Sequence, residues 1–422
     1  MSAEPLVRGD LRSRIDDMRD ELAQFYVDLH RHPELSGQEL RTSEKAAEQL
    51  RRYGFDVTTG IGGHGVVGIL RNGAGPTVLL RADADALPVL EETGLPYASD
   101  AVGIDESGHE VPVMHACGHD IHVTCLVGAA QVLAEQIGEW SGTLLVVFQA
   151  SEETGTGAQS MLDDGLFERF PCPTVVLGQQ VVPRPAGTIT VKPGVLMAAA
   201  DSLRITMHGR GGHGSQPEST VDPILMAATT IVRLQGIVAR EIAPADSAVV
   251  TVGAVHGGTK ENVIPRDATL SINVRTFDDG VRERVLSSIT RIAHAEATAS
   301  GAPAPPTIAS TGNFPLTVND AEATERVTSA LRDHLGHDKI GPMNPLSGSE
   351  DFGLLAAASG AASAFWFLGG TDPDIWAAAD TAGTVHRDNP SNHSPQFAPV
   401  IHPTLETGVE ALVVAALCWL TA

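Results

Sequence analysis

The sequence predicts an α/β fold that carries a smaller α+β module as an insertion. Strand-like apolar runs alternate with helical stretches in the first half of the chain, which is typical of helices layered on a buried sheet. Near Ala198 the pattern changes to strands of alternating apolar and polar residues and two long helices, which is typical of an antiparallel α+β unit. The length of 422 residues is enough for two domains.

The first part opens with two helices, over residues 12–29 and about 38–53, because apolar residues recur there at helical spacing. Gly54 is suited to cap the second helix. A further helix is expected over residues 121–137. The strands expected around it, from their apolar runs, are residues 66–70, 77–80, 143–148 and 174–177.

The inserted module has its own pattern of elements. Its expected strands and helices are residues 203–207, 224–240, 248–252, 268–275 and 281–297. The proline-rich residues 302–306 are expected to form a hinge, after which the chain returns to α/β character and closes with a helix. We therefore predict a discontinuous domain, residues 1–197 and 307–422, with a second domain, residues 198–306, inserted into it.

Composition excludes several classes of partner. The formal charge is −24, from 52 acidic against 28 basic residues, whereas a nucleic-acid binder needs a basic face. The same charge disfavours an anionic membrane surface, and no apolar run approaches the roughly 18 residues of a spanning helix. The N-terminus has no apolar core of a signal peptide, and four cysteines are too few for a disulfide framework. We expect a cytoplasmic protein without nucleic-acid or membrane partners.

The densest cluster of reactive side chains is residues 114–122, with three histidines, a cysteine and an aspartate. These residue types are metal ligands, and Gly118 lets the backbone turn so that Cys117 and His119 face one point. Asp120 can then cap the following helix. The alternative is a capped helix start with histidines that face solvent.

Two further segments offer ligands or catalytic groups. Glu152 and Glu153 follow a buried strand, and ligand sites of open α/β sheets lie beyond the carboxyl ends of strands. Because adjacent side chains point in different directions, one acid can ligate a metal while the other acts as a base. The alternative is a pair of exposed acids in a loop. His393 precedes the terminal helix, and a lone loop histidine is more often merely exposed.

These segments together resemble the N-acyl-amino-acid amidohydrolases of the aminoacylase/carboxypeptidase metallopeptidase superfamily, which includes hippurate hydrolases, auxin-conjugate amidohydrolases and N-acyl-glutamine aminoacylases. The resemblance covers residues 25–400 and implies a zinc-peptidase-like mixed-sheet catalytic domain with an inserted lid or dimerisation domain. The motifs that carry it, in chain order, are residues 30–34 (HRHPE), 81–88 (RADADALP), 114–122 (MHACGHDIH), 149–155 (QASEETG), 211–214 (GGHG), 262–265 (NVIP), 348–352 (GSEDF) and His393.

The resemblance also implies roles for individual residues. Glu152 would be the general base and then the acid, and Asp83 would orient a metal ligand. Cys117 would bridge two divalent metals as a thiolate. The full ligand set carried over from the family is Cys117, His119, Glu153 and His393.

One position departs from the family pattern. Relatives have Gly-x-His-Val after the strand at residues 174–177, whereas this chain has Gln180 in place of the histidine. A carboxamide oxygen is a weak, neutral ligand compared with imidazole. We therefore expect one or two divalent ions per subunit, Zn, Mn, Co or Ni, with the second bound loosely or absent.

The inserted module contributes three more candidates. His213 lies between glycines and, by the resemblance, reaches the active site of a partner subunit and stabilises the oxyanion; otherwise it is a turn histidine. Asn262 and Arg275 fall where the family contacts the substrate carboxylate, and a guanidinium suits bidentate carboxylate binding. The alternative for Arg275 is a surface salt bridge. These roles imply a homodimer or a larger homo-oligomer.

The function that the resemblance implies is metal-dependent hydrolysis of linear amides other than peptide bonds. The expected substrates are N-acyl amino acids or similar small amides, which yield a carboxylate and an amino acid. The alternatives are a dipeptidase or a carbamoyl-amino-acid hydrolase. An alternative of another class is a non-hydrolytic binding protein whose metal site is degraded at Gln180, although the retention of Glu152 argues against it.

Overall fold

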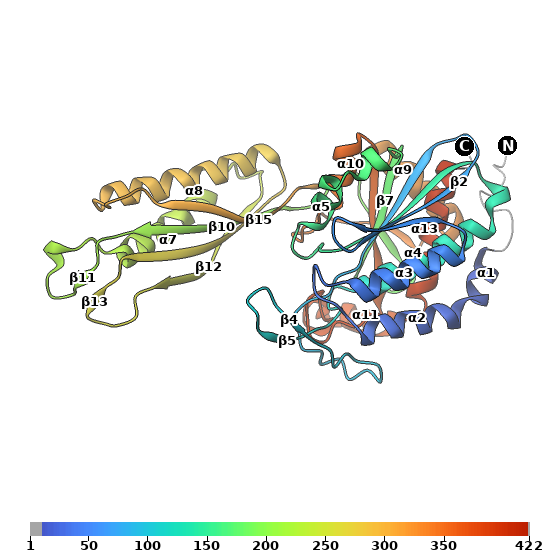
Figure 1. Cartoon of the computed structure of the whole chain (residues 1–422), viewed down its shortest axis with the longest axis horizontal. Helices are drawn as coiled ribbons and strands as arrows, with labels where there is room; N and C mark the ends of the chain where they lie inside the picture. Colours follow the sequence, from blue (N-terminus) through green and yellow to red (C-terminus); the bar gives the residue numbers. More distant parts are fainter. Residues whose placement is uncertain (1–10, 421–422) are drawn as a thin grey trace. The chain divides into compact units, whose positions relative to one another are not determined.

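A computed structural model describes residues 11–420, which divide into two compact units. The first unit contains the chain up to Leu196, Val318–Asn344, and the chain from Asp351 onward. The second contains Met197–Thr317 and Pro345–Glu350. Figure 1 labels the elements of both units. The fold class is as predicted, an α/β unit with a mixed sheet and an inserted α+β unit.

The first unit is built on an eight-stranded mixed sheet. Its central strands β6, β3, β7 and β18 run parallel, while β1 and β2 pair antiparallel at one side. The strands are, in sheet order, β1 (Asp56–Ile61), β2 (Gly65–Asn72), β6 (Gly142–Gln149), β3 (Thr77–Asp83), β7 (Val175–Pro185), β18 (Ala362–Thr371), β8 (Ile189–Val191) and β17 (Ile340–Pro342). The central strands are apolar along their length because helices cover both faces.

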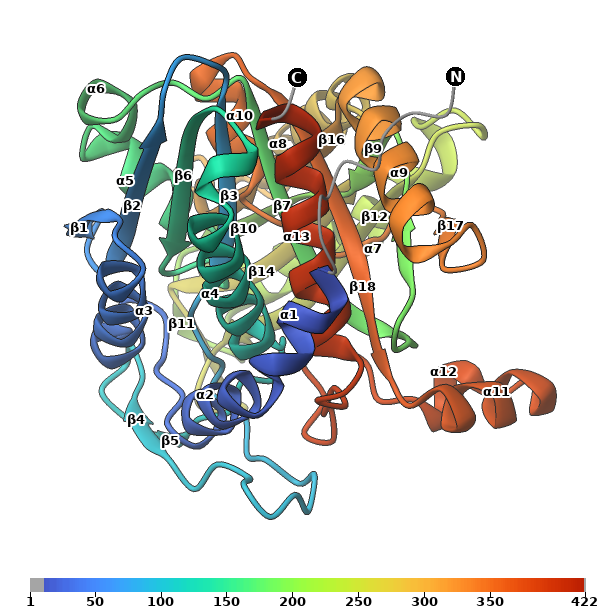
Figure 2. The same ribbon diagram turned by 90° about the vertical axis from the view of Figure 1, so that its right-hand side faces the viewer.

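Helices cover both faces of this sheet (Figure 2). On one face lie α3 (Leu40–Arg52), α4 (His119–Glu135), α9 (Ala321–Leu335) and α13 (Thr404–Leu420), with α1 (Leu11–Asp17) and α2 (Arg19–Arg31) packed outside them. Trp366 points into this layer, whereas its neighbour Phe365 points to the opposite face. There its ring packs at a tilt against that of Phe352, at the start of α10 (Gly353–Ser359), with 4.7 Å between ring centroids. α5 (Gly157–Asp163) packs against α10 and β6.

The apolar stretch near the C-terminus forms α13, and its side chains are buried almost all round. It packs on α4, α9 and β3, so its hydrophobicity is explained by the core. Across residues 11–420, no helix is both long enough and apolar enough to span a membrane. The remaining short elements are β4 (Val102–Ile104), β5 (Glu110–Pro112), η1 (Ile137–Glu139), α6 (Leu166–Arg169), β9 (Gly194–Met197), β16 (Thr317–Asn319), α11 (Pro373–Ala382) and α12 (Val385–Asp388).

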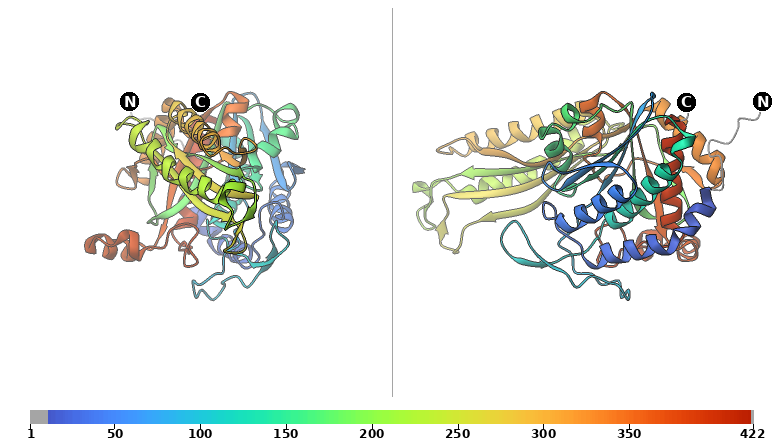
Figure 3. Two further views of the ribbon diagram at one scale, coloured as in Figure 1. Left: turned by 90° about the vertical axis from the view of Figure 1, so that its left-hand side faces the viewer. Right: turned by 45° about the vertical axis from the view of Figure 1, so that its right-hand side comes forward.

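The second unit is a four-stranded antiparallel sheet with two helices (Figure 3). In β14 buried and half-buried residues alternate strictly, so that Leu270, Ile272 and Val274 face the helices. The elements in sheet order are β12 (Ala248–Gly257), β14 (Asp267–Thr276), β10 (Ala199–His208) and β15 (Thr307–Phe314), packed with α7 (Pro223–Arg240) and α8 (Asp279–Ala299). A small ribbon joins β11 (Gly212–His213) to β13 (Val263–Ile264), with η2 (Pro217–Ser219) beside it.

The structure moves two of the expected boundaries. The helix expected over residues 12–29 is divided into α1 and α2 at Met18, a buried residue with non-helical backbone angles. The proline-rich residues 302–306 do not end the inserted unit. They lead into β15, which pairs with β10 in the same sheet, so the second unit continues to Thr317.

Candidate metal centre

The candidate centre lies at the carboxyl ends of neighbouring strands of the first unit. Asp83 is the last residue of β3, and it pairs in register with Gln149, the last residue of β6. Glu152 and Glu153 lie in the turn after β6, separated from the end of the strand by two residues, and His119 is the first residue of α4. Residues that the sequence separates by up to 70 positions therefore meet at one edge of the sheet, as open α/β sheets require of a ligand site.

Four predicted ligands converge on this edge. Ligand atoms of Cys117, Glu153 and His393 lie within 4.8 Å of one another. Glu153 Oε1 is shared, since it lies 3.3 Å from His393 Nε2 and 3.8 Å from His119 Nε2. Glu152 Oε2 lies 3.9 Å from His119 Nε2, so both adjacent acids reach the cluster.

The residues present fit a divalent cation. Within residues 11–420, both ring nitrogens of the fully buried His119 have no hydrogen-bond partner that meets the usual geometry. Buried polar atoms without partners are rare, and this imidazole lies beside thiol and carboxylate groups, which also bind zinc and similar ions. Hydrogen bonds with Cys117 and Glu153 raise the pKa of His393 to about 10, which reflects the negative charge gathered at this point.

Local backbone geometry brings the ligands together. Gly118 has a φ of +81°, and a Cβ there would lie 2.4 Å from Val181 Cγ1, so only glycine fits between Cys117 and His119. His393 also has a positive φ, of 70°, and its N–H donates to the Ala116 carbonyl at 2.8 Å. This bond fastens the His393 loop to the turn that carries Cys117.

Asp83 supports the cluster through contacts with histidines and does not lie among the four predicted ligands. His122 Nδ1 donates to Asp83 Oδ1 at 2.5 Å, and His122 Nε2 accepts from the Val181 N–H at 2.8 Å. Because both nitrogens of His122 are used by the protein, that residue is a support and not a ligand. Burial alone would raise the pKa of Asp83, but the charges of His119, His122 and Arg81 outweigh it and lower the pKa well below its usual range.

Several supporting residues escaped the sequence analysis. Asp85 Oδ1 lies 3.3 Å from His119 Nδ1, so it faces the second nitrogen of that ligand. The spacing of Asp83 and Asp85 along an extended segment could have signalled this, because residues two apart share a side. Buried Arg81 donates to Asp83 Oδ2 at 2.9 Å and to Asp351 Oδ1 at 3.0 Å.

Glu39 is a second residue that the sequence did not indicate. Its Oε1 accepts from the Ser151 N–H at 2.8 Å and from the Gly37 N–H at 2.9 Å, and Ser151 has a positive φ of 57°. Burial, with a smaller contribution from Asp85, raises the pKa of Glu39 to about 7. Glu39 thus holds the turn that presents Glu152 and Glu153.

Gln180 lies beside Cys117, at the position where relatives have histidine. Its Nε2 is 3.1 Å from the Cys117 carbonyl oxygen. Asn392, which precedes His393, donates to the same carbonyl at 3.2 Å. The sequence analysis gave Asn392 no role.

The three candidates in the second unit have distinct surroundings. His213 Nδ1 accepts from the Ser215 N–H at 3.1 Å, so in the neutral ring Nε2 carries the proton and can donate. The Gly214 N–H donates to the Asn262 carbonyl at 2.9 Å, which joins the two loops. Arg275 donates to Ser349 Oγ at 2.8 Å and to the Ser347 carbonyl at 3.1 Å. No carboxylate among the described residues forms an ion pair with Arg275, so the alternative of a surface salt bridge is not observed.

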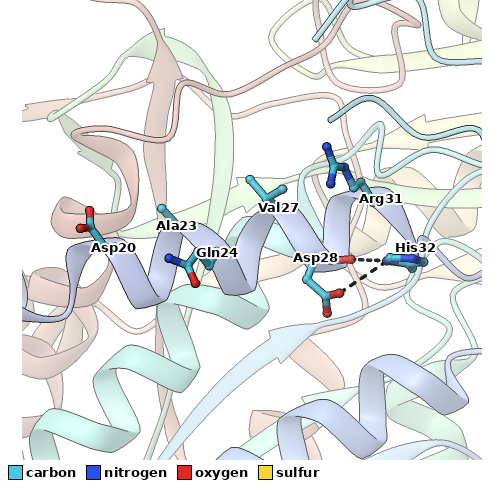
Figure 4. Close-up of a pocket in the computed structure, with 7 residues that line it drawn as sticks. All are labelled: Asp20, Ala23, Gln24, Val27, Asp28, Arg31 and His32. Carbon is cyan, nitrogen blue, oxygen red and sulfur yellow. Dashed lines mark hydrogen bonds and ion pairs between the residues drawn. The ribbon is translucent and has the colours of Figure 1, made fainter. Parts of the chain in front are cut away.

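A depression of about 400 Å³ lies on α2, outside the candidate centre. Figure 4 shows the residues that line it. His32 Nδ1 contacts the carbonyl oxygen of Asp28 at 2.7 Å within it. The Asp28 carboxylate is paired with Arg41 at 2.7 Å and with Lys45 at 2.8 Å. The charge of Asp28 is therefore compensated, and we assign no function to the depression.

His30, from the HRHPE motif, is buried between two carboxylates. Its Nδ1 lies 2.6 Å from Asp120 Oδ2, and its Nε2 lies 3.1 Å from Glu91 Oε1. Burial alone would lower the pKa of His30, but the bonds to Asp120 and Glu91 raise it to about 9. The ring is therefore an imidazolium that ties α2 to the start of α4.

This buried imidazolium makes stability depend on pH. The pKa of His30 is higher in the folded chain, so its contribution is fully present below about 6.5 and is lost as the pH rises through about 9. We expect wild type to lose up to about 3 kcal/mol more free energy of unfolding over this range than His30→Gln, which cannot titrate. Denaturant unfolding at each pH measures the difference, in which contributions of other groups cancel. Equal slopes for the two proteins would show that His30 is neutral.

Comparison with known proteins gives matches that are all named as peptidases or amide hydrolases. Residues 79–391 match the model of the family described as Peptidase family M20/M25/M40. The chain is 38% identical over 360 residues to the hippurate hydrolase of Campylobacter jejuni, covering 84% of this chain and 90% of that protein. It is 35% identical to the N-acetylcysteine deacetylase of Bacillus subtilis, covering 78% and 83%. The solved structure of Bacillus subtilis YXEP, described as a dinuclear metal binding peptidase, covers 96% of this chain and 99% of that chain, with a TM-score of 0.74 and 28% identity.

Proposed function

Because this chain belongs to peptidase family M20/M25/M40, we propose that it is a metal-dependent amidohydrolase that cleaves the amide bond of N-acyl amino acids or similar small amides. The products are a carboxylate and an amino acid. The observation that carries the proposal is the convergence of Cys117, His119, Glu153 and His393, with Glu152 beside them, at one edge of the sheet. The names of the two relatives, a hippurate hydrolase and a deacetylase, support this class of substrate.

Each residue of the centre has a task in this reaction. Cys117, His119, Glu153 and His393 would hold the cation, which when bound polarises the amide carbonyl and lowers the pKa of water. Glu152, 5% exposed, takes the proton of the attacking water and returns it to the nitrogen of the leaving amine. Asp83 and Asp85 hold the His119 ring in place.

The second unit completes the proposal. His213 would donate from Nε2 to the oxygen that becomes negatively charged in the transition state. Asn262 and Arg275 would bind the substrate carboxylate, a role supported by the guanidinium of Arg275, which has only neutral hydrogen-bond partners among the described residues.

We further propose a homodimer or larger homo-oligomer in which the second units meet. Strand β12 is ten residues long and lies at the edge of its sheet, and an unpaired edge of this length is a template for another strand. Apolar side chains are exposed on β12 and on α7, namely Val249, Val255, Leu225 and Val232.

All four cysteines are free thiols, which supports a reducing, cytoplasmic location.

The proposal is tested by removing metal with a chelator and then adding Zn²⁺, Mn²⁺, Co²⁺ or Ni²⁺ singly. Hydrolysis is measured on a panel of N-acyl amino acids, dipeptides and N-carbamoyl amino acids. We expect no hydrolysis by the stripped protein and restored hydrolysis of N-acyl amino acids with at least one metal. If only dipeptides or only carbamoyl compounds were hydrolysed, the proposed substrate class would be wrong and that class would take its place. A protein that binds the panel compounds but hydrolyses none, with metal reloaded, would be a binding protein.

A further inference from the structure

We propose that Gln180 and Asn392 form a pair of carboxamides that takes the place of a second cation beside Cys117, so that each subunit holds a single ion. Cys117 would then be a ligand of one ion and not a bridge between two. This inference rests on the proposed metal centre, but it does not depend on which amide is hydrolysed. It sets this chain apart from the similar YXEP structure, which is described as dinuclear.

The two side chains reach the same atoms from different segments. Gln180 Nε2, on β7, lies 3.1 Å from the Cys117 carbonyl oxygen, 3.3 Å from the Val181 carbonyl oxygen and 3.5 Å from Cys117 Sγ. Asn392 Nδ2, in the His393 loop, lies 3.2, 3.0 and 3.8 Å from the same three atoms. Both amide nitrogens therefore stand between two backbone carbonyls and face the sulphur.

The backbone carbonyls of Cys117 and Val181 determine which end of each side-chain amide, NH₂ or oxygen, faces Cys117. A backbone carbonyl oxygen can only accept hydrogen bonds, so the NH₂ groups of Gln180 and Asn392 must point at it, and the amide oxygens must point away. Reversing either amide would set its oxygen against two carbonyl oxygens. The atom that Gln180 presents to the sulphur is thus a donor, and a cation needs an acceptor.

This orientation opposes a second ion at Cys117. The amide hydrogens carry partial positive charge, so a cation on this side of the sulphur would be repelled. If one amide turned to ligate, the carbonyls of Cys117 and Val181 would each lose one of their two amide donors and would face the oxygen of the turned amide. A histidine at residue 180 would offer a ring nitrogen that can bind a metal.

The pair leaves enough ligands for one ion. Cys117, Glu153 and His393 present their ligand atoms within 4.8 Å of one another, and three protein ligands are the usual number at a catalytic zinc site. Asn392 and His393 are neighbours in a loop whose backbone is fixed to Ala116. The same loop therefore supplies one ligand and one of the two carboxamides.

The test compares retained metal in variants that turn a donor into a ligand. Gln180→Glu and Asn392→Asp keep the shape of the side chain but replace NH₂ by a carboxylate oxygen, a ligand that divalent ions accept. Gln24→Glu, on the exposed surface of α2, adds the same charge away from Cys117 and is the matched control. Stripped proteins are loaded with Co²⁺ or Zn²⁺ and dialysed, and the ions per chain are counted by mass spectrometry.

We expect one retained ion per chain in wild type and in Gln24→Glu, and two in Gln180→Glu or in Asn392→Asp. Electron paramagnetic resonance of the Co²⁺ proteins should show isolated ions in wild type and magnetic coupling in the two-ion variant. Two retained, coupled ions in wild type would overturn the inference, as would no retained ion. So would one ion in both site variants with their folds intact. Because metal content is read directly, a wild type with one ion that hydrolyses no amide would reject the proposed function and leave the carboxamide pair standing.

Discussion

Replacing Glu152 by glutamine is expected to lower kcat/KM for amide hydrolysis by at least ~10²-fold while the bound metal remains, because the substitution removes the group that takes and returns the proton. Glu152 lies 3.9 Å from His119 Nε2 but is not needed for the ligand group of Cys117, Glu153 and His393. Steady-state kinetics on the best substrate, together with metal analysis of the same sample, measures both quantities.

Glu153→Gln is the matched control for this prediction. Its Oε1 is shared between His119 and His393, so the substitution should reduce metal occupancy, and activity should recover in part with excess metal. If Glu152→Gln keeps near-wild-type turnover, or if it loses metal while Glu153→Gln keeps it, the roles of the two acids are reversed or wrongly assigned.

His213→Ala is expected to lower kcat by about 10²- to 10³-fold, the usual cost of removing one donor to a developing oxyanion. The fold of the second unit should persist, because His213 is exposed and its side chain bonds only to Ser215 among the described residues. His294→Ala, at an exposed position on α8 of the same unit, should keep wild-type kinetics.

Mixing two inactive variants decides which subunit His213 serves. If His213 acts on the centre of a partner, heterodimers of His213→Ala and Glu152→Gln chains contain one centre with both residues intact, and activity should partly return. Subunit exchange must be verified, for example with differently tagged chains. No recovery in verified heterodimers would place His213 with its own subunit's centre or outside catalysis.

The sequence predicted most of the helices and central strands because their patterns are local. Residues 144–148 and 175–177 are continuous apolar runs, and α7 and α8 have an apolar face. Strand β15 was missed because it is an exposed edge strand without apolar alternation, and the preceding prolines suggested a hinge. Its place is set by pairing with β10, about a hundred residues earlier, which no local pattern records.

The site was predictable where its residues are neighbours or belong to a recognisable motif. Cys117 and His119 stand two residues apart, and the adjacent acids mark the end of β6. The link between Arg81 and Asp351 joins residues 270 positions apart, so only the folded chain shows it. Asn392 was missed for a different reason: a carboxamide has no characteristic spacing, and its role appears only through the carbonyls that it contacts.

The discontinuity of the first unit has a consequence for how the protein is made. Strand β18 pairs with β7 and β8, and it is synthesised only after every residue of the second unit. Until then the apolar edge of β7, buried in the finished sheet, has no partner on that side, and such edges are prone to aggregation. His393 and α13 are translated later still. We therefore expect nascent chains that end before residue 362 to depend on chaperones, and the metal centre to form only after His393 has left the ribosome.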